Sequence, residues 1–289
     1  MYPANFEYHD PSTVADVLSL LRQHGDNAKL LAGGQSLIPL MKLRLASPAV
    51  LIDLGRVREL RGIREEGGAL VIGATTTHHD LESSALVRAK APLLAQAAAA
   101  IGDLQVRNRG TIGGSLSHAD PAADWPAALL ALDAELHVTA GSPRIIPAAS
   151  FFVDLMTTAL EPGEIVTAIR VPIPAAGGAA YAKVRQPASG FALVGIAVQL
   201  AIEAMPQQQC RAAAIGVTGV APAPFRAKAA ERLLEGRALD EATITAAAEQ
   251  VVDGVEALAD LHASSEFRAH LAKVHTRRAI ATALRQTST

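Results

Sequence analysis

The feature that most constrains this chain is a pair of glycine-rich turns, which lie about eighty residues apart in the sequence. The first reads Ala32-Gly33-Gly34-Gln35-Ser36-Leu37, and the second reads Gly110-Thr111-Ile112-Gly113-Gly114-Ser115. Each follows an apolar stretch that predicts a strand, residues 28–31 and residues 104–106. Two adjacent glycines allow backbone N–H groups to converge without a Cβ in the way. The two turns together therefore predict loops that hold the diphosphate of one ligand.

The spacing of the glycines excludes two common nucleotide-binding motifs. Neither turn is the dinucleotide fingerprint G-x-G-x-x-G, and the chain contains no G-x-x-x-x-G-K-[ST] phosphate loop. Glycine pairs before helix N-termini would supply several N–H donors together with the positive end of the helix dipole. Taken singly, either turn is explained as well by an ordinary tight turn.

Composition limits the class of protein. With 289 residues, of which 50% are hydrophobic, we expect two domains. The formal net charge is only −2, so neither nucleic acid nor an anionic membrane surface is indicated as a partner. A single cysteine, Cys210, excludes an internal disulfide framework, a protein-held iron–sulfur cluster and a cysteine-rich zinc site. We expect a soluble cytoplasmic chain without a signal peptide or membrane span.

Hydrophobic periodicity predicts an α+β fold. We expect a helix capped by Ser12 and closed by Gly25, a short helix from Ser36, and strands at residues 50–54 and 70–72. Further helices are predicted at residues 89–101 and 121–132, and further strands at residues 134–139 and 164–171. The segment from Pro172 to Gly178 holds two prolines and two glycines and reads as a linker. Three strands follow, at residues 180–184, 193–204 and 210–220, and then helices to about residue 284.

These elements predict two domains. The first spans residues 1–175 and consists of two α+β lobes that separate near residue 73. The second spans residues 179–289 and carries a three-stranded antiparallel sheet with helices, because its strands precede its helices. The histidines of His78-His79-Asp80 point different ways on a helix and lack a third ligand, so a capped helix start is favoured over a metal site.

Several motifs occur in one order along the whole chain. They are Phe6-Glu7-Tyr8-His9, the first glycine turn with Ile38-Pro39, Ile72-Gly73-Ala74-Thr75-Thr76-Thr77, Arg107-Asn108-Arg109 before the second glycine turn, Asp120-Pro121-Ala122-Ala123-Asp124, Glu161-Pro162-Gly163-Glu164-Ile165 and Tyr181-Ala182-Lys183. Together they resemble the FAD-binding medium subunit of molybdenum hydroxylases, the family of the carbon monoxide dehydrogenase medium subunit and the flavin domain of xanthine dehydrogenase. The resemblance implies a two-lobed FAD-binding domain of the PCMH type, followed by the C-terminal α+β domain.

The resemblance also implies a set of cofactor-binding residues. The diphosphate of FAD would lie against Ala32, Gly33, Gly34, Gln35, Ser36 and Leu37, and against Thr111, Ile112, Gly113, Gly114 and Ser115. Contacts there would come mainly from backbone donors and from the hydroxyls of Ser36, Thr111 and Ser115. Gln35 and Ser115 depart from the histidine and asparagine that are frequent in the family, so their side-chain contacts would differ.

Three further residues are implied, each with a structural alternative. Asp124 would lie near the adenosine ribose, and its alternative is a charge at a helix N-terminus. Lys183 would lie near the flavin edge, where a cation stabilises the reduced ring; its alternative is a solvated strand lysine. Phe191 would lie against the isoalloxazine face, and its alternative is a core phenylalanine.

The function that the resemblance implies is electron transfer. The chain would be an oxidoreductase subunit that holds FAD, accepts electrons from iron–sulfur (2Fe-2S) clusters of a small subunit and passes them to an external acceptor. The substrate would be oxidised at the molybdopterin cofactor of a large subunit, within a dimer of heterotrimers. This chain would then supply no catalytic acid–base residue and no metal ligand. Two alternatives remain: a self-contained flavin oxidoreductase, and a nucleotide-binding module without redox chemistry.

Overall fold

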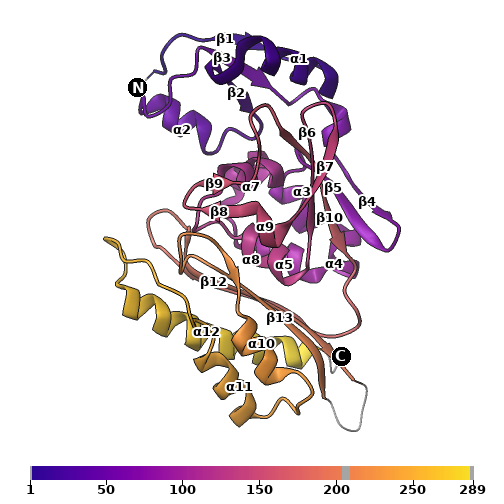
Figure 1. The fold of residues 1–289 in the computed structure, drawn as a ribbon, viewed down its shortest axis with the longest axis vertical. Helices are drawn as coiled ribbons and strands as arrows, with labels where there is room; N and C mark the ends of the chain where they lie inside the picture. Colours follow the sequence, from indigo (N-terminus) through magenta and orange to yellow (C-terminus); the bar gives the residue numbers. More distant parts are fainter. Residues whose placement is uncertain (1, 204–208, 287–289) are drawn as a thin grey trace.

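The chain is described from a computed structural model, which covers residues 2–203 and 209–286. Three groups of elements follow one another along the longest axis in sequence order (Figure 1). An N-terminal lobe is followed by a central lobe and then by a C-terminal domain, each built around its own sheet. The architecture is therefore α+β, as predicted.

The N-terminal lobe is a parallel sheet with the strand order β1-β3-β2. Its elements are β1 (Glu7–His9), α1 (Val14–His24), a 3₁₀ turn (Gly25–Asn27), β2 (Ala28–Leu31), α2 (Leu37–Lys42) and β3 (Val50–Asp53). Each strand returns to the sheet through a helix, which is how neighbouring strands become parallel. The first glycine turn is the connection between β2 and α2.

Local sequence signals predicted both ends of α1 to within one residue. The hydroxyl of Thr13 accepts a hydrogen bond from the backbone N–H of Asp16, so Thr13 is the N-cap rather than the predicted Ser12. Gly25 ends the helix with φ of 51°, as predicted, because a residue without a Cβ adopts this conformation at low cost.

The central lobe is an antiparallel sheet with the order β4-β5-β10-β6-β7. Its strands are β4 (Ile63–Glu66), β5 (Ala69–Gly73), β6 (Glu135–Thr139), β7 (Pro143–Pro147) and β10 (Ile165–Pro172). A 3₁₀ turn (Arg58–Leu60) precedes β4. Between β7 and β10 the chain forms a short helix, α9 (Ala148–Phe151), and a hairpin of β8 (Phe152–Asp154) and β9 (Thr157–Thr158). The predicted separation of the lobes near residue 73 is wrong. Strand β5 pairs with β4 and β10, so the change of sheet falls between β3 and β4.

Six helices lie between β5 and β6. They are α3 (His78–Ser83), α4 (Ala85–Lys90), α5 (Pro92–Ala100), α6 (Leu104–Arg109), α7 (Ile112–His118) and α8 (Trp125–Ala131). The predicted strand at residues 104–106 is wrong, because Asp103 accepts a hydrogen bond from the N–H of Val106 and starts α6 there. The predicted helix 89–101 is interrupted at Ala91, because Pro92 has no N–H and begins a new helix.

The C-terminal domain is an antiparallel sheet with the order β11-β12-β13-β14. Its elements are β11 (Ala179–Arg185), β12 (Ala192–Ile202), β13 (Cys210–Thr218), β14 (Phe225–Arg226), α10 (Lys228–Leu234), α11 (Glu241–Glu249) and α12 (Ser265–Gln286). The three predicted strands are present, and the short β14 adds a fourth that the sequence did not predict. Residue 204, the predicted end of the second strand, lies outside the described residues.

The sheet of the C-terminal domain is covered on both faces. Helices α10 and α12 pack on one face, and helices α5 and α8 of the central lobe pack on the other (Figure 1). The largest hydrophobic cluster reflects this, since it includes Ala179 and Ala197 together with the central lobe. Two smaller clusters fill the C-terminal domain and the N-terminal lobe. Among the described helices, none is long and apolar enough to cross a membrane.

Candidate functional site

The two glycine turns meet in space. A Cβ built on Gly33 would lie 2.6 Å from the Cα of Gly110, and a Cβ built on Gly114 would lie 3.7 Å from the Cβ of Ala32. Gly33 therefore has to be a glycine, because any side chain would collide with the backbone that leads into the second turn. The fold brings together two segments that the sequence keeps far apart.

The first turn presents unused backbone donors. Within the part of the chain that the structure describes, the N–H groups of residues 34–37 have no hydrogen-bond partner. Gly34 has φ of 75°, and Ser36 occupies the N-cap of α2 without a side-chain capping bond. Gln35 is exposed, and its side chain reaches only the carbonyl of Gly33, at 3.5 Å. A row of free N–H groups at a helix start suits the phosphate of a ligand.

The second turn differs, because its backbone donors are used inside the chain. Their acceptors are the Thr76 carbonyl for Ile112 (3.1 Å), the Ala74 carbonyl for Gly113 (2.8 Å), the Thr111 hydroxyl for Gly114 (3.2 Å) and the Thr111 carbonyl for Ser115 (3.0 Å). The side chain of Ile112 is fully buried. The prediction that this turn binds mainly through backbone donors does not fit these bonds. What it offers a ligand is the exposed surface of Gly114 and the half-buried Ser115.

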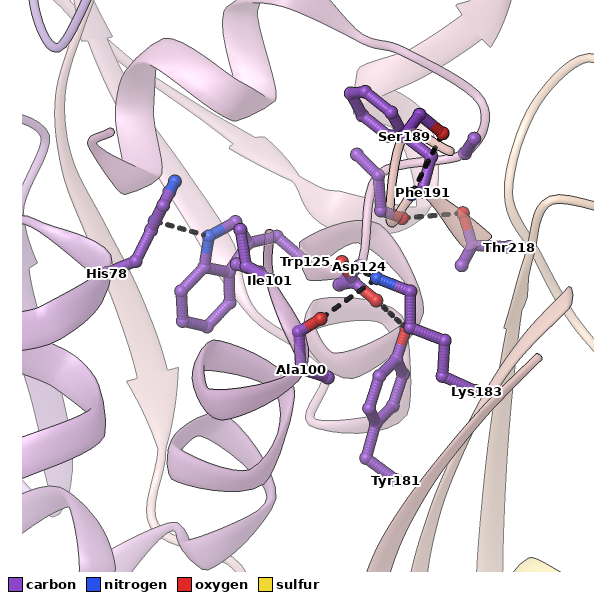
Figure 2. A network of polar contacts seen from close by, with 12 residues as sticks. His78, Ala100, Ile101, Asp124, Trp125, Tyr181, Lys183, Ser189, Phe191 and Thr218 are labelled. Atoms are coloured by element: carbon purple, nitrogen blue, oxygen red, sulfur yellow. Dashed lines mark hydrogen bonds and ion pairs between the residues drawn. The ribbon is translucent and has the colours of Figure 1, made fainter. Parts of the chain in front are cut away.

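Asp124 and Lys183 form a buried ion pair (Figure 2). The ammonium Nζ of Lys183 lies 2.8 Å from Oδ2 of Asp124, and each side chain is only 4% exposed. Lys183 also donates to the carbonyl of Ala100 at 3.0 Å, and the hydroxyl of Tyr181 donates to Oδ1 of Asp124 at 2.6 Å. The alternative of a solvated lysine is therefore wrong for Lys183. Asp124 does lie at the N-terminus of α8, as its alternative states, but its side chain makes no capping bond there.

Burial acts on all three groups of this cluster. It raises the pKa of the Asp124 carboxyl, while Lys183 beside it acts in the opposite direction. It lowers the pKa of Lys183, against the attraction of Asp124, and holds the pKa of Tyr181 well above its ordinary value. Because the carboxylate accepts two donors and the ammonium has two acceptors, the ion pair is the form that these contacts support.

A chain of hydrogen bonds joins this cluster to the second glycine turn. The backbone N–H of His78 donates to the carbonyl of Gly110 at 3.0 Å, and the indole N–H of Trp125 donates to Nδ1 of His78 at 3.1 Å (Figure 2). Trp125 directly follows Asp124 in α8. Burial, reinforced by the positive charge of Arg107, lowers the pKa of His78 from 6.5 to about 4, so the imidazole is neutral at pH 7.

Phe191 lies in the loop between β11 and β12. Its side chain is 44% exposed, which excludes the alternative of a core phenylalanine. The ring lines a cavity of about 220 Å³, to which residues 120–122, the loop from Gln186 and residues of the segment 258–268 also contribute. An exposed aromatic ring at the wall of a cavity is available to a planar ligand.

Two residues of the site were missed by the sequence analysis. Tyr181 belongs to the motif Tyr181-Ala182-Lys183, and its spacing from Lys183 puts both side chains on one face of β11. No sequence signal indicated that Asp124 faces them. His78 was assigned to a capped helix start, and the capping box of Thr77 and Asp80 confirms that start. Among the described residues, no group of three or more histidine, cysteine or acidic side chains could hold a metal ion.

Known proteins match this chain over nearly its whole length. The model of the FAD binding domain in molybdopterin dehydrogenase matches residues 4–174, and that of the CO dehydrogenase flavoprotein C-terminal domain matches residues 179–283. The carbon monoxide dehydrogenase medium chain of Hydrogenophaga pseudoflava is 43% identical over 284 residues, 97% of each chain. A solved structure of carbon monoxide dehydrogenase from that organism aligns with a TM-score of 0.93 at 44% identity, covering 98% of each chain. Quinoline 2-oxidoreductase from Pseudomonas putida 86 aligns with a TM-score of 0.93 at 34% identity, covering 100% of each chain.

Proposed function

Because this chain belongs to the family of FAD-binding medium subunits of molybdenum hydroxylases, which includes the carbon monoxide dehydrogenase medium chains, we propose that it carries electrons between its partner subunits and an external acceptor. The electrons would come from the iron–sulfur clusters of a small subunit, and the substrate would be oxidised at the molybdopterin of a large subunit. The complex would be a dimer of heterotrimers in the cytoplasm, a location supported by the single cysteine of the chain.

The observation that carries this proposal is the meeting of the two glycine turns beside the start of α2. The free N–H groups of residues 34–37 would bind the diphosphate of FAD, and the close approach of Gly33 to Gly110 would hold the second turn against it. Ser115 would add a hydroxyl. The donors and the absence of Cβ atoms fit a phosphate group, so the residues present agree with the cofactor that the family carries.

The remaining site residues would orient the cofactor and shape its surroundings. Bound FAD supplies a ring that takes up one or two electrons. Phe191 would provide an apolar face for that ring and limit the access of water. Lys183, held by Asp124, would supply a fixed positive charge in a buried setting, where electrostatic effects are stronger than in water. These three residues bind and orient, and none is assigned a proton-transfer step.

The test is the FAD content of the purified chain and of the variant Gly33→Val. The unmodified chain should be yellow, hold about one FAD and lose its flavin absorption with dithionite. In the variant the new side chain would meet the backbone at Gly110 and separate the turns, so FAD content should fall about tenfold or more, since 1.4 kcal/mol of lost binding already gives a factor of ten.

Ala140→Val is the matched control, because Ala140 is exposed in another part of the central lobe and also becomes a valine. It should retain FAD, and circular dichroism should show that both variants are folded. Full FAD occupancy in a folded Gly33→Val protein would overturn the assigned site. Turnover of an organic substrate by the purified single chain would instead support the self-contained oxidoreductase.

A further inference from the structure

We propose that Tyr181 is a positioning residue, which acts through Asp124 to keep the Lys183 ammonium charged and fixed in place. The fold brings three side chains together, Asp124 at the N-cap of α8 and Tyr181 and Lys183 on β11, and Figure 2 shows them converging. Only the consequence for the cofactor rests on the proposed function.

Tyr181 contacts both α5 and β12. Its backbone N–H donates to Oε1 of Gln96 at 2.9 Å, which ties the strand to α5. Its hydroxyl oxygen lies where a Cβ on Gly195 would be only 2.5 Å away, so the glycine of the neighbouring strand β12 makes the space that the phenol occupies. From this position the hydroxyl donates to Oδ1 of Asp124 at 2.6 Å.

The hydrogen bond from Tyr181 decides where the proton of the cluster resides. A buried carboxylate and a buried ammonium can exist as an ion pair, or they can pass a proton and become neutral. A donor to the carboxylate stabilises its charged form, and this in turn keeps the lysine protonated. Tyr181 supplies that donor at 2.6 Å, on the carboxylate oxygen that Lys183 does not use.

The other groups around the cluster do not replace this donor. From α5, Lys183 meets the carbonyl of Ala100, which accepts a hydrogen bond but carries no charge. On β11 itself, Arg185 is the remaining charged group that acts on the cluster, through its field alone. Asp124 makes no capping bond in α8. Loss of the Tyr181 hydroxyl therefore leaves one oxygen of a carboxylate that is only 4% exposed without its direct partner.

The decisive measurement is the protonation of Lys183 in the cofactor-free chain. The chain contains six lysines, so an NMR titration of labelled lysine side chains is resolvable, and Lys183→Gln assigns the signal. Tyr181→Phe removes the hydroxyl and keeps the ring. We expect this loss to shift the balance between the ion pair and the neutral pair about tenfold toward the neutral pair, the size of one hydrogen bond to a charged group, so that the Lys183 signal at pH 7 moves toward that of a neutral amine.

Tyr8→Phe is the matched control. The hydroxyl of Tyr8 also donates to a carboxylate, that of Asp53, at 2.7 Å, but the tyrosine is 52% exposed and lies in the N-terminal lobe. This variant should leave the titration of Lys183 unchanged. If Tyr181→Phe leaves it equally unchanged, Tyr181 only packs and the proposal is overturned.

The unmodified chain gives a second test that does not depend on the folding of a variant. The Lys183 side chain should show the signal of a charged ammonium at pH 7, and the Tyr181 hydroxyl proton should exchange slowly with water. A neutral Lys183 amine at pH 7 would overturn the proposal, whatever the variants show.

The FAD-loaded chain separates this proposal from the proposed function. Tyr181→Phe and Lys183→Gln should both shift the midpoint potential of bound flavin to more negative values, and the double variant should shift it no further than Lys183→Gln alone. If the unmodified chain binds no FAD, the proposed function fails, while the lysine titration still decides the role of Tyr181. Additive shifts in the double variant would mean that Tyr181 acts independently of Lys183, and would overturn the proposal.

Discussion

At the scale of single residues, His78 is the contact on which the second glycine turn depends. Its backbone binds Gly110, and a Cβ on Gly110 would lie 2.7 Å from Nε2 of His78. The glycine is therefore required there for close approach to an imidazole. Nδ1 of that imidazole accepts the Trp125 indole N–H, so a neutral ring is the form that fits.

The neutral state of His78 predicts a pH dependence of stability. Its pKa is lowered from 6.5 to about 4 in the folded chain, so above pH 6.5 the group is neutral in both states and costs nothing. As the pH falls from 6.5 to 4, the His78 imidazole takes up a proton in the unfolded chain but stays neutral in the folded chain. The free energy of unfolding therefore falls by about 3 kcal/mol. His78→Asn keeps an acceptor for Trp125 and should remove this loss. Urea unfolding at pH 7 and pH 4 measures it.

His79→Asn is the control for this measurement, because the neighbouring His79 side chain is 47% exposed. It should follow the unmodified chain at both pH values. An equal loss of stability in His78→Asn and in the unmodified chain would show that other groups cause the acid sensitivity.

Residue patterns predicted the site in part. Gly33 and Gly34 could be predicted as site residues from the sequence, because paired glycines before a helix are a local sequence signal. The pairing of Asp124 with Lys183 and Tyr181 is not readable, because it joins α8 to β11 across the boundary between two domains. Likewise, no local pattern reveals that the N–H of Gly113 is already bound to Ala74.

At the scale of elements, the two wrong predictions have different causes. Residues 104–106 are too few to show a period, and the capping signal of Asp103 was the better guide to α6. Gly73 was taken as the end of a lobe, although it is the last residue of a strand whose partner β10 begins at residue 165. Strand pairing over such a separation depends on the whole fold. By contrast, β11 to β13 were predicted because long apolar strands between turn signals are informative.

The packing of α8 on β13 gives the prediction at this scale. A Cβ on Gly216 would lie 2.8 Å from the carbonyl carbon of Ala127, so only a glycine lets the helix approach the strand. Gly216→Val should destabilise the chain by about 3 kcal/mol through overpacking. Ala212→Val, at an exposed position of the same strand, should change stability by less than about 0.5 kcal/mol. Chemical denaturation compares the two, and equal stabilities would contradict the contact.

At the scale of the whole molecule, the central lobe and the C-terminal domain share one interface. Polar contacts fasten it at several points: Gln96 binds the carbonyl of Ala179, Thr218 donates to the carbonyl of Pro121, and Arg226 donates to that of Leu130. The buried pair of Asp124 and Lys183 lies in the same interface. Separating the two parts would leave a charged pair and one face of the third sheet exposed to water, so we expect them to unfold together.

Trp125 provides a direct measurement of this cooperativity. It is the single tryptophan of the chain and is fully buried in α8, so its fluorescence reports on the central lobe. Amide hydrogen exchange along β13 reports on the C-terminal domain. Both signals should change at the same urea concentration, because α8 packs directly on β13 and neither surface is stable alone. Lys183→Gln leaves the Asp124 carboxylate buried without its counter-charge and should lower both midpoints together. Loss of protection in β13 while Trp125 stays buried would instead show two units that fold independently and only touch.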